Sequence, residues 1–70
     1  MDRQAVSSSN LASIGYDPST ETLEIEFVKT GKVYEYYNVP QFMYDRLMEA
    51  PSHGVFFNVE IRNVYACNPL

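Results

Sequence analysis

The sequence has one cysteine, Cys67, one histidine, His53, and no tryptophan. A single thiol cannot close an internal disulfide, and one Cys with one His is too small a set to hold structural zinc. A chain of 70 residues must therefore be stabilised by packing. Six tyrosines and four phenylalanines are available for a core, and each ring can bury about 150–250 Å². We predict a single domain over residues 1–70, without metal or cofactor.

Long apolar segments are also missing. No run approaches the roughly 18 apolar residues of a membrane span, and Met1-Asp2-Arg3-Gln4 does not open like a signal peptide. We therefore expect no membrane association and a cytoplasmic location. The polar stretch Ser7-Ser8-Ser9 has no apolar pattern, so we expect residues 1–9 to form a loose N-terminal arm.

Positive charge is scarce. Five Lys and Arg residues stand against nine Asp and Glu residues, which gives a net charge of −4. Nucleic-acid phosphates are bound largely through Lys and Arg, so this balance argues against a general nucleic-acid binder. Specific binding through a local cluster of cations and aromatic rings stays open.

Two alternating runs flank Thr30-Gly31 and predict a β-hairpin. A two-residue loop that ends in glycine suits a primed β-turn. In that register Phe27 pairs with Tyr34 and Ile25 pairs with Tyr36. Both tyrosines then share the face of the sheet that carries Ile25 and Phe27, because side chains alternate along a strand.

A second hairpin is predicted at the turn Asp17-Pro18-Ser19-Thr20. A loop over residues 18–21 pairs Tyr16 with Leu23 and gives the same division of faces. The predicted core face consists of Ala12, Ile14, Tyr16, Leu23, Ile25, Phe27, Tyr34 and Tyr36. The opposite face carries Glu24, Glu26 and Glu35, and we expect it to be a solvated acidic surface.

Helical spacing begins after Val39-Pro40 and ends at Pro51, which disfavours helical geometry in the residue before it. Ser52 is a candidate N-cap for a second helix, with Gly54 making a close approach in its first turn. That helix would carry Phe57, Ile61, Val64 and Tyr65 on one side. The β-branched residues near Phe57 favour a strand over 54–64 instead, and we prefer the helix. The prediction is an α+β fold in the order β-β-β-α-α, a three-stranded antiparallel meander with two short helices on one face.

Three tyrosines are candidates for binding. Tyr34 and Tyr36 could serve as a platform on which bases stack, but their shared face favours a role in the core. Tyr37 lies on the opposite face and is the better candidate for an exposed contact.

His53 follows Ser52, but neighbours in sequence do not supply a nucleophile, a base and an orienting group. We therefore expect no enzymatic activity. Arg62 and Tyr65 could present a charged and aromatic corner for a carboxylate or phosphate. An ion pair of Arg62 with Glu60, Glu49 or another of the acidic residues is the preferred alternative.

Taken together, the chain resembles the KTSC domain, a short module found at the C-terminus of some lysyl-tRNA synthetases and alone in small bacterial and phage proteins. The resemblance is carried, in order, by Val6-Ser7-Ser8-Ser9, Ile14-Gly15-Tyr16-Asp17, Tyr34-Glu35-Tyr36, Val39-Pro40, Ala50, Ser52, Gly54, Phe56-Phe57-Asn58, Ile61-Arg62 and Tyr65. It implies a domain without established activity, for which the synthetase fusions suggest RNA binding.

Two functions follow as hypotheses. The first is a non-enzymatic module that binds a protein or peptide through its sheet face and edge strands. The alternative is binding of tRNA-like RNA through Arg62, Tyr65 and the Lys29/Lys32 turn. Open strand edges would allow a weak homodimer, and a monomer is equally consistent with the sequence.

Overall fold

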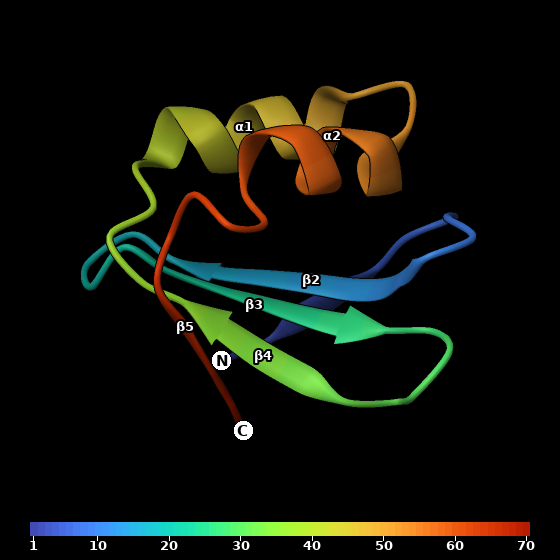
Figure 1. Ribbon diagram of the computed structural model, residues 1–70. Helices are drawn as coiled ribbons and strands as arrows, with labels where there is room; N and C mark the ends of the chain where they lie inside the picture. Colours follow the sequence, from blue (N-terminus) through green and yellow to red (C-terminus); the bar gives the residue numbers. More distant parts are fainter.

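The computed structural model describes all 70 residues as one sheet with two helices on one of its faces (Figure 1). The sheet has five antiparallel strands in sequence order. The elements are β1 (Arg3–Ala5), β2 (Leu11–Asp17), β3 (Thr22–Phe27), β4 (Val33–Tyr36), α1 (Gln41–Glu49), α2 (His53–Glu60) and β5 (Cys67–Pro69). The α+β class and the predicted order of β2, β3, β4 and the two helices are confirmed. The predicted number of strands, three, is wrong.

The two additional strands lie at the edges of the sheet. β1 pairs with β2, so the segment expected to be a loose arm contributes a strand. β5 pairs with β4 and begins after the turn at Asn63, which has a positive φ of 65°. Each has three residues, all exposed, and neither carries an apolar alternation. A strand held only by backbone pairing leaves no such pattern in the sequence.

The hairpin between β2 and β3 has the predicted register. Tyr16 pairs with Leu23 and Ile14 pairs with Ile25 across the loop 18–21. Nearer the start of β2 a bulge falls at Ala12, because Leu11 pairs with Phe27 while Ser13 pairs with Glu26. The extra residue brings Leu11 to the helix-covered face, where it is fully buried in place of the predicted Ala12.

The hairpin between β3 and β4 differs from the prediction by two residues. Ile25 pairs with Tyr34, and Leu23 pairs with Tyr36. The loop has four residues, 28–31, and Gly31 takes a positive φ of 69°. A shift of two residues keeps every side chain on its predicted face, because side chains alternate with a period of two. The pairing was therefore wrong, and the assignment of faces was right.

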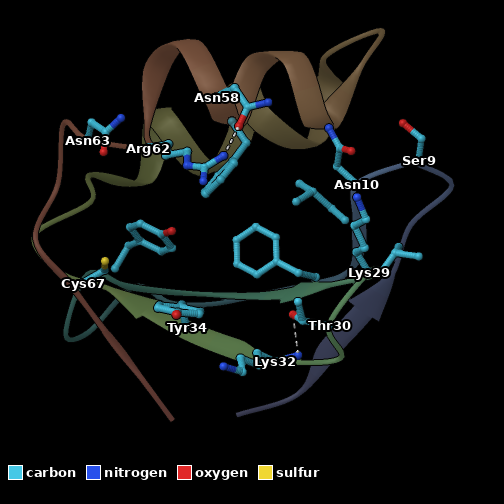
Figure 2. A pocket seen from close by; sticks show the side chains of 15 residues that line it. Ser9, Asn10, Lys29, Thr30, Lys32, Tyr34, Asn58, Arg62, Asn63 and Cys67 are labelled. Atoms are coloured by element: carbon cyan, nitrogen blue, oxygen red, sulfur yellow. Dashed lines mark hydrogen bonds between the residues drawn. The ribbon is translucent and has the colours of Figure 1, made fainter.

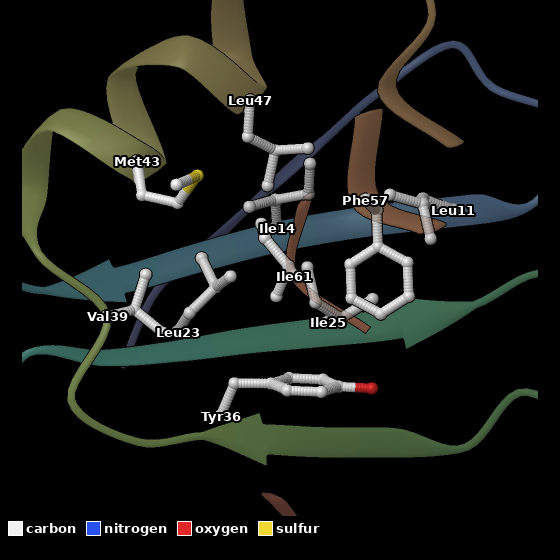
Figure 3. Close-up of a cluster of buried hydrophobic side chains, with 10 residues drawn as sticks. All are labelled: Leu11, Ile14, Leu23, Ile25, Tyr36, Val39, Met43, Leu47, Phe57 and Ile61. Atoms are coloured by element: carbon white, nitrogen blue, oxygen red, sulfur yellow. The ribbon is translucent and has the colours of Figure 1, made fainter. Parts of the chain in front are cut away.

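The core lies between the two helices and the face of the sheet that carries Ile25 and Tyr36 (Figure 3). Phe57 of α2 and Ile61, which directly follows this helix, pack onto the sheet together with Met43 and Leu47 of α1. The ten buried apolar residues are Leu11, Ile14, Leu23, Ile25, Tyr36, Val39, Met43, Leu47, Phe57 and Ile61. Neither helix has the length and apolarity that a membrane crossing would require.

The second helix is shorter than expected. Ser52 caps it as predicted, because its hydroxyl oxygen accepts a hydrogen bond from the Val55 N–H at 3.2 Å. Gly54 also makes the predicted close approach, since a Cβ there would lie 2.9 Å from the Asn10 side chain. The helix ends at Glu60, however, and Val64 beyond it is exposed instead of packed.

The sheet face away from the helices is less open than predicted. Glu24 is buried and forms an ion pair with Arg3 of β1 at 2.8 Å. Arg3 also donates to the Ser13 hydroxyl, which donates in turn to Glu26. Gly15 leaves room for this arrangement, because a Cβ there would lie 2.9 Å from the Arg3 side chain. Two of the three predicted surface glutamates are therefore held in an internal network.

Candidate functional site

An open groove of about 820 Å³ lies between the β3–β4 hairpin, the start of β2 and the end of α2 (Figure 2). Its floor is aromatic because the register of β3 and β4 places Tyr34 and Tyr36 on the helix-covered face. Phe27 from β3 and Phe57 from α2 complete this floor. The lining consists of Ser9, Asn10, Leu11, Phe27, Val28, Lys29, Thr30, Lys32, Tyr34, Tyr36, Phe57, Asn58, Arg62, Asn63 and Cys67.

The floor rings are fixed by edge-to-face contacts. The Phe27 ring lies 5.8 Å from Tyr34 and 5.6 Å from Phe57, and Tyr36 lies 5.3 Å from Phe57. Tyr36 and Phe57 belong to the buried core, whereas Phe27 and Tyr34 are only half-buried. The predicted core role is confirmed for Tyr36, whereas Tyr34 packs against the core as a half-buried residue. Tyr34 nevertheless keeps aromatic surface that a ligand in the groove could contact.

The rim of the groove is basic. Lys29, Lys32 and Arg62 account for three of the five Lys and Arg residues, and none of the nine acidic residues lines the groove. All three cations are exposed. In Figure 2, Arg62 and Cys67 lie at one end of the groove and Lys29 lies at the other, with Lys32 on the lower edge. A chain with a net negative charge therefore has a locally positive groove.

Arg62 makes no ion pair. Its guanidinium donates a hydrogen bond to the Asn58 side chain at 3.3 Å, and the structure's single salt bridge joins Arg3 to Glu24. The expected pairing with Glu60 or Glu49 is therefore wrong. The single bond to Asn58 leaves most of the five N–H donors of this guanidinium free.

Comparison with known proteins identifies the family. A sequence model of the KTSC domain matches residues 7–65. The chain belongs to the KTSC domain family. The crystal structure of a KTSC domain protein from Yersinia pestis matches with a TM-score of 0.95 and 42% identity, covering 99% of this chain and 96% of that one. The resemblance drawn from the sequence is confirmed.

Two kinds of relatives share this KTSC domain. An uncharacterized protein of Stutzerimonas stutzeri (strain A1501) is 47% identical over 58 residues, which cover 83% of this chain and 80% of that protein. A lysine–tRNA ligase of Nostoc sp. (strain PCC 7120) is 40% identical over 50 residues, 71% of this chain. The match spans only 9% of that ligase. The domain therefore occurs both in small proteins and as a minor part of larger enzymes.

Other predicted site residues of this KTSC domain lie away from the groove. Tyr37 is half-buried on the opposite face, where its hydroxyl donates to Glu35 at 3.1 Å. Tyr65 packs against the core from the segment after α2. Tyr16, part of the opening motif, donates to the Val39 carbonyl at 2.6 Å and stacks on Tyr44. Of the five predicted binding residues, the structure brings together Tyr34, Tyr36 and Arg62 at the groove.

His53 has a structural environment. Its Nδ1 lies 2.8 Å from the carbonyl oxygen of Leu47, at the junction of the two helices. Ser52 is engaged as the cap of α2, so the two residues do not form a nucleophile and base pair. The structure holds no group of three or more His, Cys, Asp or Glu side chains with the arrangement of a metal site.

Sequence reasoning missed the amide groups of the groove. Asn10, Asn58 and Asn63 line it from three separate segments, and no local motif links them. Asn63 carried one available signal, because asparagine tolerates the positive φ that ends a helix. Cys67 of β5 also lies at the rim, beside β4.

Tyr36 gives this domain a specific pH dependence. Burial is the largest cause and the nearby Cys67 is the second; together they raise the pKa of its hydroxyl from 10.0 to about 12. The folded protein therefore holds the Tyr36 proton more tightly than the unfolded chain does. The resulting contribution to the free energy of unfolding is fully present below pH 10 and is lost as the pH rises toward 12. This loss amounts to at most about 3 kcal/mol. We expect Tyr36→Phe to lose less unfolding free energy than the wild type between pH 9 and 12 in urea titrations. Parallel curves for the two proteins would contradict this assignment.

Proposed function

We propose that this KTSC domain is a non-enzymatic module that binds a single-stranded segment of RNA in the groove. The observation that carries the proposal is the basic rim over an aromatic floor, without any acidic lining residue. Modules that bind single strands combine these two features, since cations follow the phosphates and rings accept the bases. Relatives that are lysine–tRNA ligases support an RNA context for the domain.

The overall charge of −4 does not argue strongly against this function. Charges at a surface act over a Debye length of about 8 Å at physiological salt. The groove is governed by its own rim of Lys29, Lys32 and Arg62, and two of the distant acidic residues, Glu24 and Glu26, are already engaged with Arg3 and Ser13. The local field and not the net charge then decides which ligand is attracted.

A protein or peptide partner was the first hypothesis from the sequence, and fewer features of the structure support it. It relied on an open sheet face and on edge strands. The Arg3 network and β1 partly cover that face, and the edge strands β1 and β5 have only three residues each. The groove offers a peptide no exposed backbone edge, because its floor consists of side chains from the paired strands β3 and β4 and from α2. We therefore place RNA binding first.

The test is a titration of the whole chain with labelled RNA of about ten nucleotides, followed by fluorescence anisotropy. We expect the single strand to bind more tightly than the same sequence in a duplex. In a duplex the bases are stacked on each other, so the rings of the groove cannot stack on them. The logarithm of the binding constant should fall with the logarithm of salt concentration with a slope of about −2, as expected for up to three phosphate contacts.

Two outcomes would reject the proposal. The first is an absence of binding at low salt, where electrostatic attraction is strongest. The second is binding that does not depend on salt or that favours the duplex. A protein or peptide partner would then be the favoured hypothesis.

A further inference from the structure

We propose that the Tyr36 hydroxyl and the Arg62 guanidinium together hold one phosphate group of a bound nucleotide, at the end of the groove formed by Arg62, Asn63 and Cys67. We call this part of the groove the phosphate end. The inference builds on the proposed RNA-binding role and names the chemical group that this end recognises. It also makes Tyr36 a ligand donor in addition to a core residue.

The first observation is an unused hydroxyl. Only 4% of Tyr36 is exposed, yet its side chain lines the groove. Its hydroxyl makes no hydrogen bond to any nitrogen or oxygen of the protein, whereas the Tyr16 hydroxyl makes one such bond and the Tyr37 hydroxyl makes two. The polar group beside it is the thiol of Cys67, a weak acceptor. No buried side-chain nitrogen or oxygen of the structure lacks a hydrogen-bond partner, so the Tyr36 hydroxyl oxygen is accessible from the groove that its side chain lines. A ligand in the groove can therefore accept a hydrogen bond from it.

The second observation is an unpaired guanidinium close by. Arg62 forms no ion pair, although the chain has nine acidic residues. Its charge acts on the Tyr36 hydroxyl and opposes the rise in the pKa of that group. The bond to Asn58 at 3.3 Å holds the guanidinium over the groove, as Figure 2 shows. Arginine is suited to phosphate because its planar fork can donate two parallel hydrogen bonds.

The ligand class follows from the donors and from the floor. The phosphate end offers the N–H groups of Arg62, the hydroxyl of Tyr36 and the amide of Asn63, and it contains no carboxylate. Since the high pKa of Tyr36 keeps its proton in place, this hydroxyl can donate at any physiological pH. An anionic group with several acceptor oxygens matches these donors. The half-buried ring of Tyr34 next to them favours a phosphate attached to a flat base over a simple carboxylate.

The experiment uses AMP, adenosine and inorganic phosphate as separate probes, with amide chemical shifts of the whole chain recorded by NMR. We expect AMP to shift residues around Arg62 and Cys67, inorganic phosphate to shift the same residues more weakly, and adenosine to leave them unchanged. Tyr36→Phe removes only the hydroxyl and should weaken AMP binding roughly 10-fold, because a hydrogen bond to a charged group is lost. Tyr44→Phe is the matched control, since the Tyr44 hydroxyl also lacks a partner and lies on α1, outside the groove.

The outcomes separate this inference from the RNA proposal. If RNA binds but Tyr36→Phe binds RNA and AMP as the wild type does, the phosphate end is rejected and the RNA proposal stands. If AMP binds through Tyr36 and RNA does not bind, the RNA proposal is rejected and the phosphate end stands. Equal shifts from adenosine and AMP would also overturn the inference.

RNA with and without a 5′-phosphate distinguishes the two possible sources of the bound phosphate. If Tyr36→Phe lowers the affinity for both RNAs, the phosphate is an internal phosphodiester. If it lowers the affinity only for the RNA with the 5′-phosphate, the phosphate is that of the chain end.

Discussion

Replacing Phe57 with alanine should destabilise the domain more than truncation of any half-buried or exposed ring. Phe57 is fully buried and contacts the rings of both Phe27 and Tyr36. It joins α2 to the sheet, so its loss leaves a cavity between the two layers. Truncation of a buried phenylalanine costs about 3–5 kcal/mol, and a domain of this length has a total stability of roughly 4–10 kcal/mol. Urea unfolding followed by circular dichroism should show a midpoint far below that of the wild type.

Phe42→Ala provides the matched control. Phe42 is 56% exposed on α1, where it carries the guanidinium of Arg46 over its ring at 5.3 Å. Its truncation should cost less than about 1 kcal/mol. Similar losses for Phe42→Ala and Phe57→Ala would mean that α2 does not depend on Phe57 for its attachment to the sheet.

The combined variant Lys29→Gln, Lys32→Gln and Arg62→Gln should lose most of its affinity for single-stranded RNA. The three residues are the only cations of the groove and all are exposed, so the fold should be retained. We expect a fall of roughly 100-fold at low salt, and a salt dependence close to zero, because no phosphate contact through a cation is left. Fluorescence anisotropy over a range of salt concentrations measures both quantities.

A control of equal charge separates a local effect from a general one. Gln41→Glu together with Arg46→Glu also lowers the net charge by three, and both positions are exposed on α1, outside the groove. This variant should bind RNA within about threefold of the wild type. If it loses as much affinity as the groove variant, the net charge governs binding and the groove is not the site.

Local rules were sufficient for much of the fold. The division of β3, β4 and the part of β2 from Ser13 onward into two faces followed from strict alternation, and the first hairpin followed from Asp17-Pro18. The N-cap at Ser52 and the stop at Pro51 were read from residue types that act within one turn. These predictions held because each depends on neighbours that are close in sequence.

The second hairpin shows where such rules fail. A two-residue loop and the observed loop 28–31 place the same side chains on the same faces, so alternation cannot distinguish them. The bulge at Ala12 likewise exchanged one apolar residue for another, Leu11, at the core. In both cases packing against the helices selects among registers that the pattern of residues treats as equal.

The candidate site was predicted in its parts and not as a whole. Tyr34, Tyr36 and Arg62 were each proposed as binding residues, but Arg62 was assigned an ion pair that the structure does not contain. The environment of the Tyr36 hydroxyl, with only the weakly accepting thiol of Cys67 beside it, also has no signal in the sequence. Contacts between distant segments decide such questions, and β5 and the end of α2 reach β4 only in the folded chain.

By itself, the sequence determined the α+β class, the membership in the KTSC family and the face on which the tyrosines lie. These properties depend on local periodicity, on turn chemistry and on an ordered set of motifs. Only the tertiary structure placed Lys29, Lys32 and Arg62 around one groove and left the Tyr36 hydroxyl without a nitrogen or oxygen partner. The reason is that charge and hydrogen-bond partners act through space, over distances that sequence separation does not report.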